Sequence, residues 1–134
     1  MLLDTSGLLC YLHRDEPQHQ KAVELLNEVN TRLFTHSYVL AELIALATVR
    51  RFHRDAVLAF MTDLLDSPDV SMIWVNESVH REAMALLAER KDKTYSLCDS
   101  VSFVLMRKLN ISEALTTDRH FEQEGFVRLL RSGI

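Results

Sequence analysis

The first seven residues, Met1 to Gly7, constrain the fold more than any other stretch of the chain. A short apolar run ends in the carboxylate of Asp4, and three small residues then lead into a second apolar stretch, Leu8 to Leu12. This pattern predicts a buried strand that places Asp4 at its carboxyl end, followed by a tight turn into a helix. Because ligands bind at that edge of open α/β sheets, Asp4 is a candidate site residue.

The rest of the chain alternates between short apolar runs and segments with helical periodicity. Further strands are predicted at 33–36, 70–75, 114–117 and 126–129, and helices at 6–13, 17–31, 38–49, 54–66, 77–90, 96–108 and 119–124. Ser37 and Asn76 are the predicted N-caps of the helices that follow them. Strands that alternate with helices predict an α/β fold with a mostly parallel sheet wrapped by helices.

Length and composition fit a single domain over residues 1–134. The chain has 48% hydrophobic and 25% charged residues, which is ordinary for a globular protein. Its two cysteines, Cys10 and Cys98, have neither metal-ligand nor redox spacing, so a reduced, cytoplasmic protein is expected. No apolar stretch approaches the roughly 18 residues that span a bilayer, so no membrane association is expected.

Four carboxylates stand in apolar surroundings: Asp4, Glu42, Asp99 and Asp118. Local roles are available for three of them, because Asp4 could serve a turn, Asp118 could cap the last helix, and Asp99 has capping-box spacing from Ser96. Glu42 fits neither a cap nor a solvated face, since its helix is apolar nearly all round and is therefore expected to be buried. A buried carboxylate needs a cation or strong hydrogen bonds to stay ionised.

The four acids are expected to share one cleft. Asp4 and Asp118 follow strands at the carboxyl edge of the sheet, and Glu42 and Asp99 lie in the first turns of helices that leave this edge. Two carboxylates about 4 Å apart repel by roughly 4 kcal/mol at an effective dielectric of about 20. Either some of them protonate or a metal ion sits among them, and oxygen ligands select Mg²⁺ or Mn²⁺. Such ions typically act on phosphates.

Four short motifs, taken in order, resemble those of PIN-domain ribonucleases and, more narrowly, of the VapC toxins of prokaryotic toxin-antitoxin modules. They are Leu3-Asp4-Thr5-Ser6, the Ala41-Glu42 helix, Ser96-Leu97-Cys98-Asp99-Ser100 and Thr116-Thr117-Asp118-Arg119-His120-Phe121. The resemblance implies a three-layer α/β/α sandwich with a four- or five-stranded sheet, divalent-metal-dependent RNA cleavage, a homodimer and a protein antitoxin.

By the same resemblance, Asp4, Glu42, Asp99 and Asp118 are the metal ligands. Ser6 and Thr117 match small hydroxyl positions that support these ligands, and His120 matches a frequent residue of the last motif whose purpose the sequence leaves open. The basic clusters at 50–54, 90–93 and 107–108 would hold the RNA backbone, or would simply complement helix C-termini. Net charge is −4, so the chain as a whole is not basic.

Several other functions compete with this interpretation. A phosphatase of the haloacid dehalogenase type and a bacterial receiver domain also have a strand that ends in Asp, but each needs further acids and a Lys that cannot be placed here. The phosphatase needs a second Asp where Ser6 stands. Two alternatives remain: a degenerate PIN-like domain that only binds RNA or protein, and a housekeeping PIN nuclease without an antitoxin.

Overall fold

A computed structural model describes residues 1–28 and 30–131. It contains a five-stranded, fully parallel sheet in the order β3-β2-β1-β4-β5. The strands are β1 (Leu2–Leu3), β2 (Leu33–His36), β3 (Val70–Ile73), β4 (Glu113–Leu115) and β5 (Val127–Arg128). The helices are α1 (Thr5–Leu12), α2 (His19–Glu28), α3 (Ser37–Val49), α4 (Arg54–Asp66), α5 (Glu77–Glu89), α6 (Leu97–Lys108) and α7 (His120–Gln123). The predicted α/β class and the parallel sheet are confirmed.

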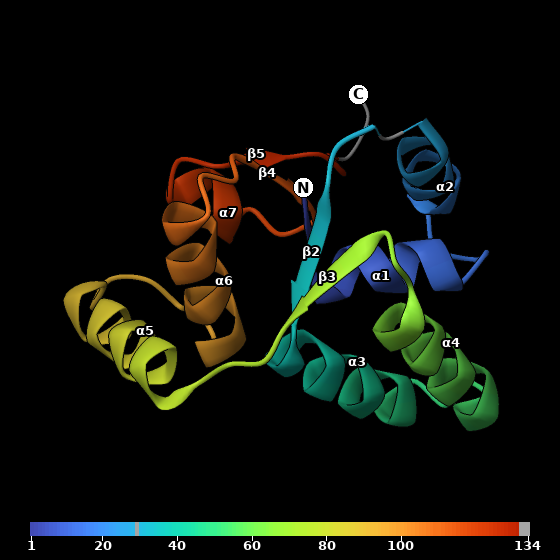
Figure 1. The fold of residues 1–134 in the computed structure, drawn as a ribbon, viewed down its shortest axis with the longest axis horizontal. Coiled ribbons are helices and arrows are strands. Elements are labelled where there is room, and N and C mark those ends of the chain that lie inside the picture. Colours follow the sequence, from blue (N-terminus) through green and yellow to red (C-terminus); the bar gives the residue numbers. More distant parts are fainter. Residues whose placement is uncertain (29, 132–134) are drawn as a thin grey trace.

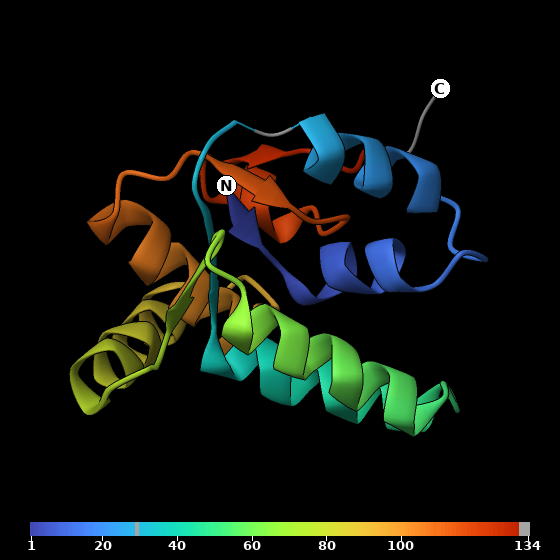
Figure 2. The same cartoon turned by 45° about the vertical axis from the view of Figure 1, so that its right-hand side comes forward.

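The helices cover the sheet on two sides, as the implied three-layer sandwich requires. Helices α1 to α4 gather on one side of the sheet, and α5, α6 and α7 gather on the other (Figure 1; Figure 2 shows the same layers after a turn). The two residues of β1 face these two helical layers. Leu3 packs in the core of the first side, and Leu2 packs in the core of the second. Side chains of a strand alternate between its faces, so this central strand is buried on both.

Capping residues fix several helix starts as the sequence indicates. The Asn76 side chain accepts a hydrogen bond from the Val79 N–H at 2.9 Å, at the start of α5. The predicted cap at Ser37 is wrong: Ser37 is the first helical residue of α3, His36 occupies the N-cap, and the Ser37 hydroxyl accepts a hydrogen bond from the Val75 N–H instead. That bond joins α3 to the segment after β3, which local sequence patterns do not reveal.

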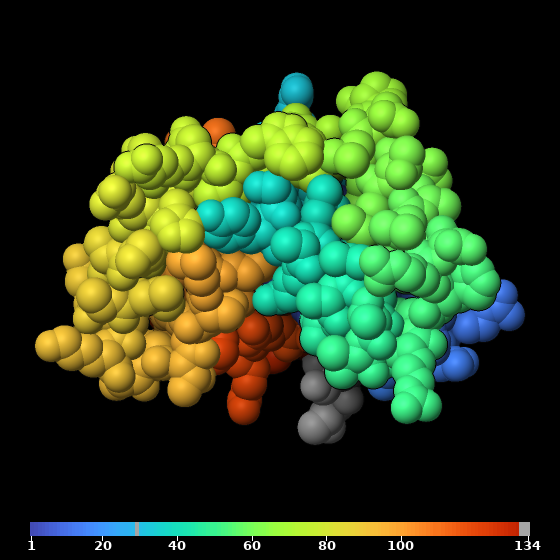
Figure 3. All heavy atoms as spheres, turned by 90° about the horizontal axis from the view of Figure 1, so that it is seen from below, coloured from blue at the N-terminus to red at the C-terminus, as the bar shows by residue number. Residues whose placement is uncertain are grey.

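Helix α3 is not buried on all sides, contrary to expectation. Ala41, Ala45 and Val49 are exposed, with 78% of Val49 open to solvent. The opposite face, with Val39, Leu43 and Ala47, packs into the core of the first side. Seen from below, α3 lies at the surface between α5 and α4 (Figure 3). The helix is apolar nearly all round, but one of its apolar faces is open to solvent and is not enclosed by the core.

The buried Glu124 carboxylate, just after α7, contacts α6 and the segment between α5 and α6. It accepts hydrogen bonds from Arg90 Nε at 2.9 Å, Arg107 Nη2 at 2.8 Å and Tyr95 Oη at 2.8 Å. Burial alone would raise the pKa of Glu124, but these donors outweigh it and lower the pKa to about 2. Two arginines from the basic clusters are thus bound to an internal anion.

Replacing Glu124 by Gln is expected to lower the free energy of unfolding by about 2 kcal/mol, because two guanidinium groups lose their shared anion. The pKa of Glu124 lies below its ordinary value of 4.5, so this stabilisation is present above about pH 4.5 and is lost as pH falls towards 2. Urea unfolding of both proteins at several pH values measures the effect. Glu77→Gln, which breaks an exposed pair with Arg81, is the control and should cost less than about 0.5 kcal/mol. Equal costs for the two variants would contradict the assigned role.

Among the residues that the structure describes, no helix combines the length and apolar character that crossing a bilayer requires.

Candidate metal centre

The four predicted acids come from the carboxyl ends of strands and from the helices that begin there. Asp4 follows β1, and Asp118 lies three residues beyond the end of β4. Glu42 lies in α3, which starts directly after β2, and Asp99 lies in the first turn of α6. Because β1 sits between β2 and β4, these segments meet near the centre of one sheet edge. This is where chain connections diverge in open α/β sheets and where ligands bind.

Asp4 is the most enclosed of these carboxylates, with 4% of its surface exposed. Its Oδ2 accepts hydrogen bonds from Thr116 Oγ1 at 2.7 Å and from Ser6 Oγ at 3.3 Å. Its Oδ1 is buried without a hydrogen-bond partner among the described residues. Burial, together with the charges of Asp99 and Glu42, raises the pKa of Asp4 to about 7, although the Thr116 hydrogen bond opposes the shift. An ionised Asp4 therefore needs positive charge nearby.

A small network of hydroxyl groups holds Asp4 in place. The Ser6 and Thr116 hydroxyls lie 3.0 Å apart, and the Thr116 hydroxyl also accepts a hydrogen bond from the Asp118 N–H at 3.0 Å. Thr117 donates its backbone N–H to Ser6 Oγ, also at 3.0 Å. The threonine hydroxyl that contacts Asp4 is thus that of Thr116, whereas Thr117 was the residue predicted to support the acids. One sequence signal could have identified Thr116: it stands two residues before Asp118. A threonine hydroxyl commonly accepts a hydrogen bond from the backbone N–H two residues later.

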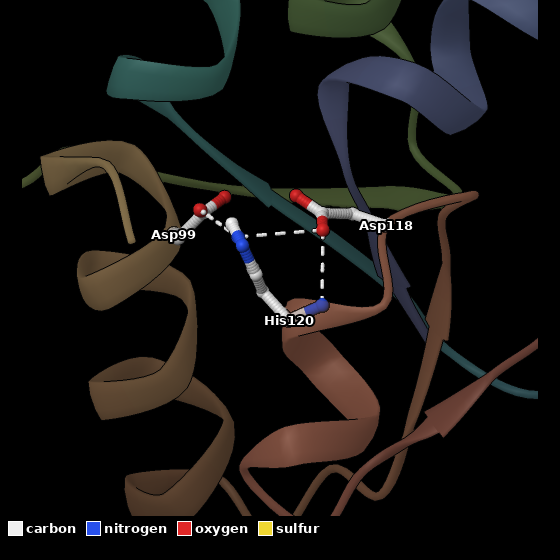
Figure 4. A group of neighbouring side chains, drawn as sticks. All are labelled: Asp99, Asp118 and His120. Atoms are coloured by element: carbon white, nitrogen blue, oxygen red, sulfur yellow. Dashed lines mark hydrogen bonds and ion pairs between the residues drawn. The ribbon is translucent and has the colours of Figure 1, made fainter. Parts of the chain in front are cut away.

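Asp99, Asp118 and His120 form a compact group of metal-binding side chains. Each offers one ligand atom, and these atoms lie within 4.8 Å of one another. Asp99 projects from α6, Asp118 from the segment after β4, and His120 from the start of α7, with the imidazole between the two carboxylates (Figure 4). The Asp118 Oδ1 also accepts the His120 backbone N–H at 2.9 Å, which anchors α7 beside the acid.

Asp99 performs the capping function that its spacing from Ser96 predicts. Its Oδ2 accepts the Ser96 N–H at 3.1 Å, and its own N–H donates to Ser96 Oγ at 3.0 Å. The same Oδ2 lies 3.1 Å from His120 Nδ1. The capping and site interpretations are therefore compatible, because the cap fixes the carboxylate in the orientation that faces the neighbouring side chains.

Glu42 is half-buried and makes no hydrogen bond or ion pair with another residue in the described part of the chain. Its charge contributes to raising the pKa of two other groups, Asp4 and Cys98. Burial raises the pKa of the Cys98 thiol, and the charges of Glu42, Asp4 and Asp99 raise it further. Negative charge from three of the four predicted acids therefore concentrates around one point, and Cys98 is an inert thiol within it.

The donor set suits a hard divalent cation. Asp99 and Asp118 provide carboxylate oxygens and His120 a ring nitrogen, while the unpartnered Oδ1 of Asp4 is a further buried acceptor. Unpaired buried acceptors of this kind are costly unless a cation or donor compensates them. Oxygen-rich sites favour Mg²⁺ or Mn²⁺. The geometry thus fits a metal centre.

Comparisons with known proteins identify the family of this chain. Residues 1–126 match the PIN domain family. The chain is 30% identical over 129 residues to the 23S rRNA-specific endonuclease VapC20 of Mycobacterium tuberculosis, covering 96% of this chain and 97% of the relative. It is 29% identical to Ribonuclease VapC26 of the same species, covering 90% and 89%. The crystal structure of VapC20, described as a sarcin-ricin loop cleaving toxin, superposes with a TM-score of 0.87 at 27% identity, covering 94% and 95%. The chain therefore belongs to the PIN domain family, and the relatives that it matches there are VapC ribonucleases.

Proposed function

We propose that this protein is a metal-dependent endoribonuclease that hydrolyses RNA phosphodiester bonds, and that it acts as the toxin of a VapC-type toxin-antitoxin pair. Its family and its full-length similarity to two VapC ribonucleases support this assignment. The observation that carries it is the convergence of carboxylates at one sheet edge, where Asp4 has a buried oxygen with no partner in the described residues.

In this proposal, Asp4, Glu42, Asp99 and Asp118 hold Mg²⁺ or Mn²⁺. Such an ion, when bound, supplies a more acidic water and neutralises charge on the phosphate. The protein contributes the rest. Ser6 and Thr116 fix the Asp4 carboxylate, the Ser96 cap fixes Asp99, and the Asp118 N–H bond to Thr116 orders the loop after β4. Because these side chains are already oriented, the site needs little reorganisation during the reaction.

RNA is held, in our proposal, by exposed cations that flank the centre. Lys91 and Lys93 are exposed on the segment that leads into α6, and Arg119 is exposed beside Asp118. Contacts from lysine and arginine to phosphates supply affinity that falls with salt but carry no sequence information. Arg90 and Arg107 contribute less, since both are engaged by Glu124.

We also propose that the protein forms a homodimer and binds a protein antitoxin. Its relatives suggest the antitoxin, and its surface offers apolar area for such contacts. Trp74 is 66% exposed and Val49 is 78% exposed, and association would remove these apolar side chains from water. Light scattering of the purified protein, alone and with a co-expressed product of an adjacent gene, measures both associations.

The activity is tested on total RNA and on 23S rRNA, with Mg²⁺ or Mn²⁺ and with EDTA. The wild-type protein is expected to cleave only with a metal ion. Asp99→Asn should slow cleavage at least about 100-fold, because the amide keeps the helix cap but loses the negative charge. Asp15→Asn, in the exposed turn between α1 and α2, is the control and should cleave like the wild type.

Two results would redirect the assignment. Cleavage that continues unchanged in EDTA would exclude the metal-dependent route. RNA binding without any cleavage, under every metal condition, would favour a degenerate PIN domain that acts only as a binding module.

A further inference from the structure

His120 lies where a metal ligand would lie, although the four acids alone were predicted to bind the metal. Its Nδ1 is 3.1 Å from Asp99 Oδ2 and 3.4 Å from Asp118 Oδ1 (Figure 4). Ligand atoms that share an octahedral ion at bonds of about 2.1 Å are separated by roughly 3.0 Å when they are adjacent. The ring nitrogen thus lies from each of the two carboxylate oxygens at a distance close to that between neighbouring ligands.

The surroundings of the imidazole favour an orientation in which Nδ1 faces the acids. Its other nitrogen, Nε2, lies 3.3 Å from Thr94 Oγ1. The ring also packs against Tyr95 at 5.0 Å with an interplanar angle of 61°. A histidine that ligates a metal commonly donates its second N–H to an oxygen, which fixes the tautomer. With the Thr94 hydroxyl as that acceptor, the Nδ1 lone pair points towards Asp99 and Asp118.

Three acceptors that face one another need positive charge between them. A proton on Nδ1 would supply it through ion pairs with the two carboxylates, and a divalent ion would supply it more fully. Asp4 strengthens the second option, because its buried Oδ1 lies at the same sheet edge and has no partner among the described residues. A divalent ion can take several carboxylate oxygens as ligands at once, which a proton on one ring nitrogen cannot do.

We propose that His120 is a direct nitrogen ligand of the metal, through Nδ1, and that Thr94 fixes its tautomer. This inference rests on the proposed function, because it assigns a further ligand to the same centre. Imidazole suits transition metals, whereas Mg²⁺ prefers oxygen ligands alone. His120 therefore shifts the preference of the centre from Mg²⁺ towards Mn²⁺.

Mn²⁺ itself is the probe that tests the assignment. Electron spin-echo spectra of Mn²⁺ bound to the wild-type protein should show ¹⁴N modulation from a coordinated imidazole, and His120→Gln should abolish it. Calorimetry should show that His120→Gln weakens Mn²⁺ binding about tenfold or more while changing Mg²⁺ binding less. His53→Gln removes an exposed imidazole at the start of α4 and should leave both measurements unchanged. Thr94→Val should weaken Mn²⁺ binding while keeping the ¹⁴N signal.

The possible failures are distinguishable. Tight Mn²⁺ binding without ¹⁴N modulation would overturn the role of His120 and leave the carboxylate centre intact. Absence of Mn²⁺ binding by the wild-type protein, or binding that Asp99→Asn leaves unchanged, would instead overturn the metal centre on which the proposed function rests.

Discussion

Replacing Asp4 by Asn is expected to abolish RNA cleavage and, in metal-free protein at pH 8, to raise the free energy of unfolding by about 1–3 kcal/mol. The stability effect follows from burial. The pKa of Asp4 is raised from 3.8 to about 7, so keeping this carboxylate ionised at pH 8 opposes folding. Asn keeps an oxygen that can accept the Thr116 and Ser6 hydrogen bonds and carries no charge. The loss of activity follows from the loss of a ligand.

The size of the stability change depends on pH. Because the folded pKa of Asp4 lies above the unfolded value, wild-type stability should fall as pH rises from about 4 to about 7, and Asp4→Asn should lack this component. Urea unfolding in EDTA measures it, with Asp15→Asn, an exposed acid, as the control. Adding Mn²⁺ should narrow the difference in free energy of unfolding between Asp4→Asn and the wild type, because the ion stabilises only the protein that binds it. The assignment of Asp4 fails if the Asn variant cleaves RNA as fast as its parent in Mg²⁺ or Mn²⁺.

Replacing Gly7 by Ala is expected to cost more than about 3 kcal/mol of stability or to prevent folding. A Cβ at position 7 would lie 1.9 Å from the carbonyl oxygen of Leu115 and 2.6 Å from its carbonyl carbon. These are backbone atoms of β4, and the Leu115 carbonyl also accepts the Asp4 N–H at 3.2 Å. Neither α1 nor the strand can move away without disturbing the pairing of β1 with β4, on which the position of Asp4 depends.

Gly125→Ala is the matched control for this prediction. Position 125 has open space around it, and only its φ of +90° disfavours a side chain. The expected cost there is about 1–2 kcal/mol, from backbone strain alone. Thermal and urea unfolding of the two variants separate a packing clash from a conformational penalty. If the free energy of unfolding of Gly7→Ala lies within about 1 kcal/mol of the wild-type value, the close approach of α1 to β4 is not essential for stability.

Much of the site was accessible from the sequence because its residues stand beside strong local signals. Asp4 and Asp118 follow apolar strands, and Asp99 stands at capping-box distance from Ser96, which the structure shows as a complete cap. The identity of the supporting groups was less accessible. Thr116 and Thr117 are adjacent and alike, and only the direction of the backbone after β4 decides which hydroxyl faces Asp4.

The sequence by itself determined the order of strands and helices along the chain and the caps at Asn76 and Ser96, because these depend on residues within one or two turns of each other. It also indicated the parallel sheet, because strands alternate with helices along the chain. Only the tertiary structure decided which distant groups meet. Thr116 reaches Asp4 across 112 positions, Gly7 lies against the Leu115 carbonyl, and His120 stands between Asp99 and Asp118. Such contacts depend on the order of strands in the sheet and on how closely helices approach it, which no local periodicity specifies.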